Sequence, residues 1–98
     1  MKKWVVYILQ SSTTGKLYTG MSNDVLRRLG VHNAGKGAKF TKSGRPWRLA
    51  YVEIVASKSD ALKREHAIKQ MSRARKLRLA QALGSGRAAP PQAAAQDS

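Results

Sequence analysis

The chain begins with an uninterrupted apolar run at residues 4–9, made of β-branched, aromatic and aliphatic side chains. A run of this kind, without polar alternation, is typical of a central strand that is covered on both faces. A polar turn at residues 11–15 and a second short run at residues 16–19 follow it. The two runs and the turn together predict a β-hairpin.

The hairpin predicts a position for two tyrosines, Tyr7 and Tyr18. If residues 10 and 15 flank the loop, the register pairs Tyr7 with Tyr18 across the two strands. Directly paired residues project from the same face of a sheet. We therefore expect the two phenols to lie side by side on one face.

A helix is expected after the hairpin. Ser22 is its predicted N-cap, and Asp24 lies in the first turn, where a carboxylate interacts favourably with the helix dipole. The stripe predicted to be buried consists of Val25, Leu26 and Leu29. His32 falls on this stripe and Arg28 on its edge, whereas Arg27 points away.

The second half of the chain continues the alternation of helix and strand. Residues 33–46 form a basic, glycine-rich loop that we expect to be mobile, and residues 47–55 resume as a strand. Ser57 predicts the start of a helix that continues to residue 71. The side chains that this helix is expected to bury are Ala61, Leu62, Ile68 and Met71.

A last helix is expected at residues 73–83, capped by Ser72 and stopped by Gly84. The fold class is therefore α/β, in one domain at residues 1–84, with a small three-stranded antiparallel sheet flanked by about three helices. Residues 85–98 have low complexity and predict a disordered tail.

The charge of the chain predicts a polyanionic partner. It has 19 Lys and Arg against 5 Asp and Glu, a net charge of +14. Such a surface binds nucleic acid through phosphate contacts that release counterions, with little regard to sequence. An anionic membrane is the rival partner, but no stretch reaches the roughly 20 apolar residues that span a bilayer. The absence of cysteine suits a reducing compartment, so we expect a cytoplasmic protein.

Five cations in and beside the basic loop are candidates for binding nucleic acid. They are Lys36, Lys39, Lys42, Arg45 and Arg48. The functional interpretation is a rim that holds phosphates; the alternative is that some of these charges serve only solubility.

Carboxylates are scarce, and Glu65 has an unusual position among them. On a helical wheel it falls between Ala61 and Leu62, on the apolar side of its helix. An acid there either pairs with a cation, binds a metal, or reaches water from the helix edge. The scarcity also disfavours a two-metal site, which needs several carboxylates. A metal-dependent phosphodiesterase built from this chain would use one Mg²⁺, which keeps much of its hydration shell.

A series of residues in chain order carries a family resemblance. It consists of Val6 and Tyr7, then Tyr18, Thr19 and Gly20, then Arg28, His32 and Glu65. The series resembles the GIY-YIG endonuclease superfamily, above all its small stand-alone bacterial proteins, over residues 3–83. The chain departs from the family pattern at Val5, where the name has glycine, and at Thr19, where an aliphatic residue is commoner.

The resemblance implies an antiparallel three-stranded sheet and metal-dependent hydrolysis of DNA, with a single Mg²⁺ or Mn²⁺ ion. It implies that Tyr7 and Tyr18 line the attacking side, that Arg28 contacts the scissile phosphate, and that His32 assists proton movement. Glu65 would hold the ion. Which phenol takes the proton is left open by the sequence.

The function expected from the sequence is a Mg²⁺-dependent DNA endonuclease with structural or weak sequence selectivity. Its specificity has to come from shape, from the basic loop or from a protein partner. The alternative is a catalytically inactive module that binds DNA or RNA. A third reading is a cationic protein that lies on a membrane surface.

Overall fold

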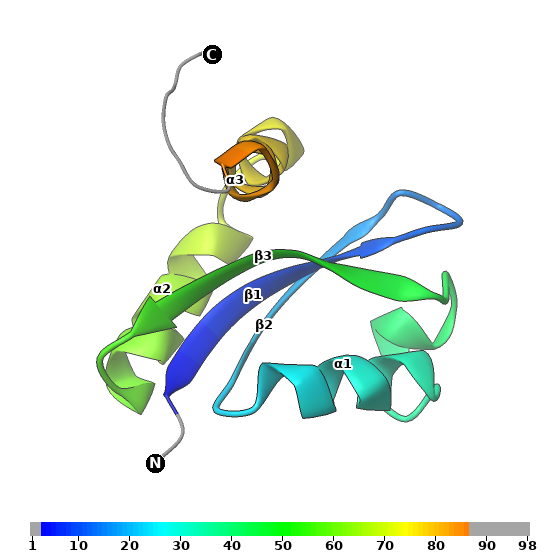
Figure 1. The fold of residues 1–98 in the computed structure, drawn as a ribbon, viewed down its shortest axis with the longest axis horizontal. Helices are drawn as coiled ribbons and strands as arrows, with labels where there is room; N and C mark the ends of the chain where they lie inside the picture. The colour runs from blue at the N-terminus through cyan, green and yellow to red at the C-terminus, as the bar shows by residue number, and fades with distance from the viewer. Residues whose placement is uncertain (1–2, 87–98) are drawn as a thin grey trace.

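The computed structural model describes residues 3–86 (Figure 1). The elements, in chain order, are β1 (Trp4–Ser11), β2 (Leu17–Ser22), α1 (Val25–Asn33), the short 3₁₀ helix η1 (Lys39–Lys42), β3 (Trp47–Val55), α2 (Lys58–Lys69) and α3 (Arg73–Gly86). The strands form one antiparallel sheet in the order β2-β1-β3. The predicted α/β class is confirmed, and the run at residues 4–9 is indeed the central strand.

The predicted hairpin register is wrong by two residues. Tyr7 pairs with Gly20, and Tyr18 pairs with Leu9. The reason is that β1 continues to Ser11, whose backbone N–H donates to the carbonyl of Lys16, so the loop begins one residue later than predicted. Side chains alternate along a strand with a period of two, so a shift of two residues keeps both phenols on the same face.

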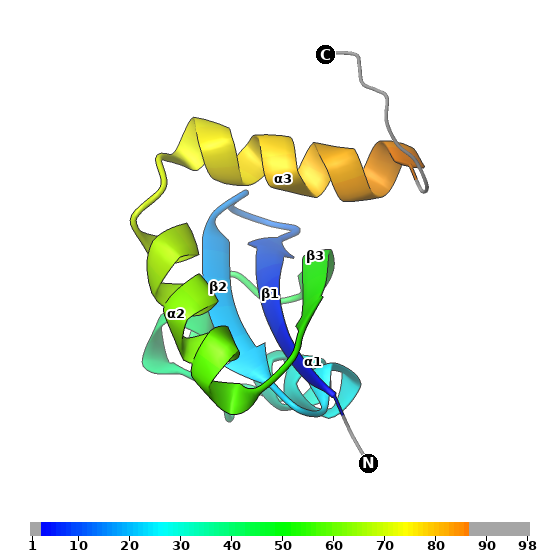
Figure 2. The ribbon, with the colours of Figure 1, turned by 90° about the vertical axis from the view of Figure 1, so that its left-hand side faces the viewer.

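The sheet is covered on both faces, as the apolar central strand requires (Figure 2). On one face, Val5, Tyr7 and Leu9 pack with Trp47 against α1. On the other face, Val6 and Ile8 pack against α2 and α3. The core is therefore two thin layers on either side of β1.

Two predictions about α1 are wrong. Its N-cap is Asp24, whose side chain accepts a hydrogen bond from the N–H of Arg27, whereas Ser22 accepts one from Asp24 itself. Leu26 is 72% exposed rather than buried. The helix packs through Val25, Leu29 and His32, which lie one above the other on successive turns. Leu26 lies about 100° around the helix from this line.

The same geometry explains Leu62 of α2, which is 52% exposed although it was predicted to be buried. Ala61 and Ile68 are buried as predicted, and Ser57 is the N-cap. Helix α3 continues past Gly84 to Gly86, because one helical glycine costs only about 1 kcal/mol. Residues 87–98 of the predicted tail lie outside the described part of the chain.

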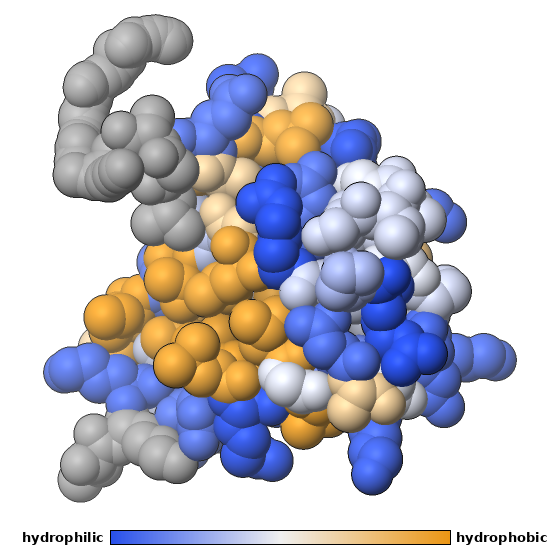
Figure 3. All heavy atoms as spheres, turned by 45° about the vertical axis from the view of Figure 1, so that its right-hand side comes forward, coloured by the Kyte–Doolittle hydropathy of each residue, from blue (hydrophilic) through white to orange (hydrophobic). Residues whose placement is uncertain are grey.

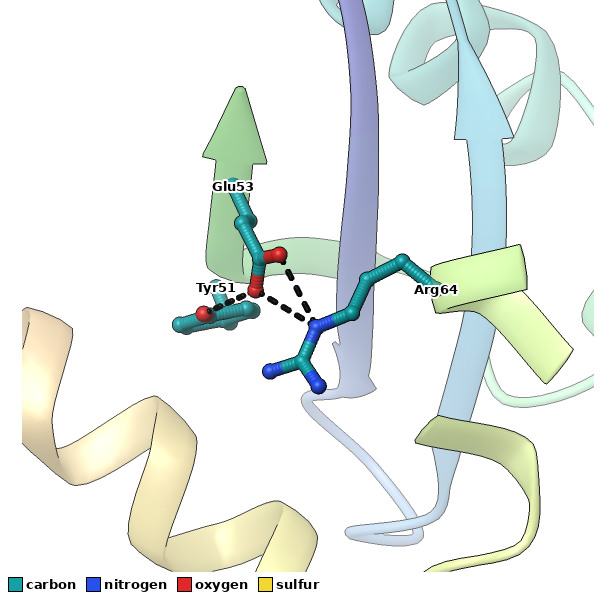
Figure 4. Close-up of polar contacts among 3 residues, drawn as sticks. All are labelled: Tyr51, Glu53 and Arg64. Carbon is teal, nitrogen blue, oxygen red and sulfur yellow. Dashed lines mark hydrogen bonds and ion pairs between the residues drawn. The ribbon is translucent and has the colours of Figure 1, made fainter. Parts of the chain in front are cut away.

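Helix α2 is fastened to β3 by a polar cluster (Figure 4). The Nε of Arg64 donates to both carboxylate oxygens of Glu53, at 3.0 and 2.9 Å. The hydroxyl of Tyr51 donates to the same carboxylate at 2.6 Å. Burial, together with this bond to Glu53, raises the pKa of Tyr51 to about 12.

The surface is strongly divided between apolar and charged areas (Figure 3). A broad apolar area occupies one side of the view and is bordered by hydrophilic side chains. Within residues 3–86, none of the helices combines the length and the hydrophobicity that crossing a bilayer demands.

Thr19 offers a test of this packing. It is 5% exposed, and its hydroxyl has no hydrogen-bond partner among the described residues. Thr19→Val is expected to raise the free energy of unfolding by about 1 kcal/mol, because an apolar side chain of similar shape removes an unsatisfied buried hydroxyl. Urea denaturation measures the change.

The control for this substitution is Thr19→Ala, which also removes the methyl group. It is expected to lower the stability, because it leaves a small cavity. A Val variant that is less stable than the parent would show that the hydroxyl has a partner, such as a buried water.

Candidate active site

The site is built on the α1 face of the sheet, where Tyr7 crosses the neighbouring strand at Gly20. A Cβ at Gly20 would lie 2.6 Å from the Tyr7 hydroxyl and 2.7 Å from Cζ. The end of the phenol ring therefore occupies the space that a side chain at position 20 would need. Gly20 is needed for this close approach.

The Tyr7 hydroxyl meets a buried histidine at the far end of α1. It lies 3.2 Å from Nε2 of His32, and Nδ1 of His32 lies 2.8 Å from the hydroxyl of Thr41. The Thr41 hydroxyl donates its single proton to the carbonyl of Ala38, at 2.8 Å. It must therefore accept from Nδ1–H, which leaves the lone pair of Nε2 to accept the proton of Tyr7.

The surroundings of His32 keep its ring neutral. His32 is 0% exposed, and a Cβ at Gly37 would overlap its ring, so the loop after α1 closes directly over the imidazole. Burial lowers the pKa of His32 below its ordinary value of 6.5, and the positive charge of Arg28 lowers it further. At neutral pH, Nε2 is thus an available proton acceptor.

Arg28 lies close to the hydroxyl of Tyr7. Its positive side chain lowers the pKa of that phenol, but burial has the larger effect and raises the pKa above 10.0. Tyr7 is only 1% exposed, Arg28 is half-buried and Arg27 is exposed, as the helical wheel predicted for the two arginines. Solvent therefore reaches Arg28 before it reaches Tyr7.

Tyr18 lies on the other side of the same histidine. Its ring centroid is 5.0 Å from that of His32, and its side chain is half-buried. The negative charge on an ionised Tyr18 would raise the pKa of Tyr7, which shows that the two phenols share one electrostatic environment. The structure thus brings Tyr7, Tyr18, Arg28 and His32 together.

Glu65 approaches this group from α2. Its negative charge contributes to the raised pKa of Tyr7. The Glu65 side chain is 20% exposed, and Nζ of Lys69, one turn later, lies 3.5 Å from its carboxylate. The Lys69 side chain is 52% exposed, so this is an ion pair at the helix surface rather than an internal one.

The donor set allows only a weakly coordinated ion. Residues 3–86 contain no cluster of three or more His, Cys, Asp and Glu side chains that could enclose a metal. A single partly exposed carboxylate fits Mg²⁺, which retains several waters, and does not fit a tightly caged ion.

The five predicted nucleic-acid-binding cations lie along the segment from the end of α1 to the start of β3. Lys36 is exposed after α1, and Lys39 and Lys42 are exposed at the two ends of η1. Arg45 donates to the carbonyls of Lys42 and, at 3.5 Å, Asn33, and Arg48 donates to Gln10, so these two are also held within the chain.

The loop that carries these cations is fastened to the site by residues that the sequence interpretation missed. The amide of Asn33 both accepts from the N–H of Trp47 and donates to its carbonyl. The indole of Trp47 in turn donates to the carbonyl of Thr41. The hydrogen bonds of Asn33 and Thr41 have no local sequence signal, because each side chain bonds to a residue far along the chain.

The fold and this site define a small α/β domain whose centre contains two tyrosines, an arginine and a histidine. A sequence profile of the GIY-YIG catalytic domain matches residues 3–78, and the chain belongs to this family of nuclease domains.

Similar proteins span nearly the same length. A UPF0213 protein of Staphylococcus haemolyticus is 48% identical over 79 residues, 81% of this chain and 95% of the relative. One of Staphylococcus aureus is 51% identical over the same shares. The solution NMR structure of a UPF0213 protein from Bacillus halodurans has a TM-score of 0.51 at 40% identity, covering 83% of this chain and 84% of that one.

The tautomer of His32 can be measured directly. ¹⁵N NMR at pH 7 is expected to show His32 neutral with its proton on Nδ1, and titration with a midpoint below 6.5. Thr41→Val removes the acceptor and is expected to give a mixture of tautomers, which Thr41→Ser corrects. A parent ring protonated on Nε2 would contradict the assignment.

The same titration predicts the pH dependence of stability. The pKa of His32 is lower in the folded protein than in the unfolded chain, so the unfolded chain binds the proton more strongly. The contribution of His32 to stability is therefore expected to be lost as the pH falls below about 6.5.

Proposed function

We propose that the protein is a metal-dependent endonuclease that hydrolyses phosphodiester bonds of DNA. The observation that carries this proposal is the hydrogen-bonded series Tyr7, His32 and Thr41, together with Arg28, whose side chain lies close enough to lower the pKa of Tyr7. It offers a cation to a phosphate at the surface and, behind that cation, a route for a proton into a buried acceptor.

Arg28 is the group that meets the substrate first. A phosphate attracts the guanidinium, and its movement toward the phosphate uncovers the hydroxyl of Tyr7. Hydrogen bonds of this kind commonly rearrange when substrate binds, so the covered phenol of the free protein is consistent with catalysis. The guanidinium then stabilises the charge that develops on the non-bridging oxygens in the transition state.

Tyr7 then relays the proton of the attacking water. The phenol passes its own proton to Nε2 of His32 and takes one from the water. The water oxygen bonds to phosphorus while the bond to the departing sugar oxygen breaks, and that oxygen takes a proton from solvent. The negative phosphate also offsets the charge of Arg28, which is one of the two causes of the low pKa of His32.

Glu65 would hold a single Mg²⁺, or Mn²⁺, at the edge of this group. The bound ion would supply positive charge to the phosphate oxygens. The weak pairing of Glu65 with exposed Lys69 supports this role, because the carboxylate is not committed to an internal partner.

The cations around η1 would hold the phosphates that flank the cleaved bond. A chain with a net charge of +14 binds such a backbone in a salt-sensitive manner. The choice of substrate then depends on the shape of this surface or on a protein partner.

Arg28→Ala is expected to reduce nicking of supercoiled plasmid by about 100-fold, the scale seen when one electrostatic donor to a transition state is lost. Its matched control is Arg27→Ala, which removes the same charge from the exposed side of α1 and should retain most of the activity. Equal losses of nicking activity in the two variants would show that Arg28 contributes only through the net charge of the protein.

Glu65→Gln is expected to abolish the stimulation of nicking by Mg²⁺ while DNA binding in the absence of metal is unchanged or slightly stronger. Asp60→Asn, which removes an exposed carboxylate from the same helix, serves as the control. The measurement is a Mg²⁺ titration of the nicking rate. If Glu65→Gln responds to Mg²⁺ like the parent, Glu65 does not hold the ion.

The substrate panel should include linear and branched DNA, with and without Mg²⁺. If the parent cuts none of these and all variants bind normally, the proposal fails, and the chain is a nucleic-acid-binding module that has kept the fold without turnover.

A further inference from the structure

Phe40 is an exposed aromatic ring at the margin of the site. It is 49% exposed, and among residues 3–86 the other Phe, Trp and Tyr side chains are buried or half-buried. It lies in η1, directly before Thr41, the residue that holds His32. Because Phe40 and Thr41 are neighbours in η1, the hydrogen bond between Thr41 and His32 also fixes the backbone position of Phe40.

A row of aromatic rings connects Phe40 to the centre of the site. Tyr18 lies between His32 and Phe40, with centroid distances of 5.0 Å to the first and 6.2 Å to the second. The Tyr18 and Phe40 rings are inclined by only 22°. Trp47, which is buried, supports Phe40 from another side at 6.0 Å. Phe40 thus extends the row outward into solvent from a rigid base.

Positive charge surrounds this ring. Nζ of Lys16, on the hairpin, lies 6.0 Å from the centroid of Phe40, at the outer limit of a cation–π contact. Lys16 is exposed, so this contact holds it weakly and a phosphate can draw it away. Lys39 and Lys42, also exposed, belong to the same turn as Phe40.

We propose that Phe40 is a stacking platform for an unpaired nucleobase next to the cleaved phosphate, with Lys16 on the adjoining phosphate. An exposed aromatic face within a cationic surface is the combination that binds single-stranded DNA, because every base can stack and every linkage is charged. The bases of an intact duplex are already stacked on one another and do not reach such a platform. The subsite therefore favours single strands and the unpaired bases of branched DNA.

This inference rests on the proposed function for the position of the cleaved phosphate, but its test needs no cleavage. Fluorescence anisotropy in EDTA measures the affinity for a labelled single strand, for the matching duplex, and for a duplex with a single-stranded flap. Phe40→Leu keeps an apolar side chain of similar size without the aromatic face, and Phe40→Tyr keeps the face.

Phe40→Leu is expected to weaken binding to the single strand and the flap by about tenfold, and binding to the duplex by less than twofold. Phe40→Tyr should bind like the parent. The matched control is Leu62→Ala, which removes an apolar side chain that is 52% exposed on α2, and it should leave all three affinities unchanged. Thermal unfolding of each variant shows that the fold is retained.

A second readout follows the base itself. A single 2-aminopurine, moved along the single strand, should change its emission strongly at one position on binding to the parent, and this change should be lost with Phe40→Leu. This measurement with the parent also tests the inference if the Leu variant does not fold.

Unchanged affinities for Phe40→Leu would overturn the inference, as would equal losses for single strand and duplex, which would indicate a general role in shaping the basic loop. If plasmid and branched DNA are never cut but the selective loss is observed, the stacking subsite stands and only the catalytic proposal fails. If DNA is cut and Phe40→Leu does not selectively weaken binding to unpaired DNA, the catalytic proposal stands and the stacking subsite fails.

Discussion

The burial of His32 is the constraint on which this molecule depends. A buried imidazole is costly unless both of its nitrogens have partners. Tyr7 supplies one partner from the central strand, and Thr41 supplies the other from η1. Satisfying one ring therefore requires the strand, α1 and the basic loop to meet, and it leaves glycine as the only residue that fits over the ring at position 37.

Two glutamates show how the structure separates a structural acid from a candidate functional one. Glu53 accepts from Tyr51 within β3 and from Arg64 of α2, and the bond from Arg64 joins the strand to the helix. Among residues 3–86, Glu65 pairs only with the exposed Lys69, and its negative charge affects Tyr7. Glu53 therefore serves the packing of α2, whereas Glu65 acts electrostatically on one of the two phenols.

The site has an inner and an outer part. The inner part is the covered Tyr7 and His32, which can exchange a proton without contact with solvent. The outer part is Arg28, Tyr18 and the surface around Phe40, which are more accessible to solvent and are the groups proposed to meet a nucleic acid first. Gly20 links the two, because the absence of a side chain in β2 lets the Tyr7 hydroxyl reach the outer part. In the proposed mechanism, cleavage of bound DNA would then depend on the movement of Arg28.

Local patterns predicted most of the secondary structure. The central strand, the limits of β3 and the Ser57 cap follow from residue type and short-range periodicity, since these depend on neighbours within a few positions. The exposure of Leu26 and Leu62 did not follow, because the sheet covers a narrower stripe of each helix than the apolar residues occupy.

The sequence by itself determined the α/β class, the positive net charge and the residues of the family motif, because composition, periodicity and motif order are properties of the chain. Only the tertiary structure decided the hairpin register, the tautomer of His32, the role of Thr41 and the freedom of Glu65 from an internal ion pair. Each of these depends on groups that are distant along the chain and meet only when the elements pack. A hydrogen bond such as that between Tyr7 and His32, 25 positions apart, has no local sequence signal.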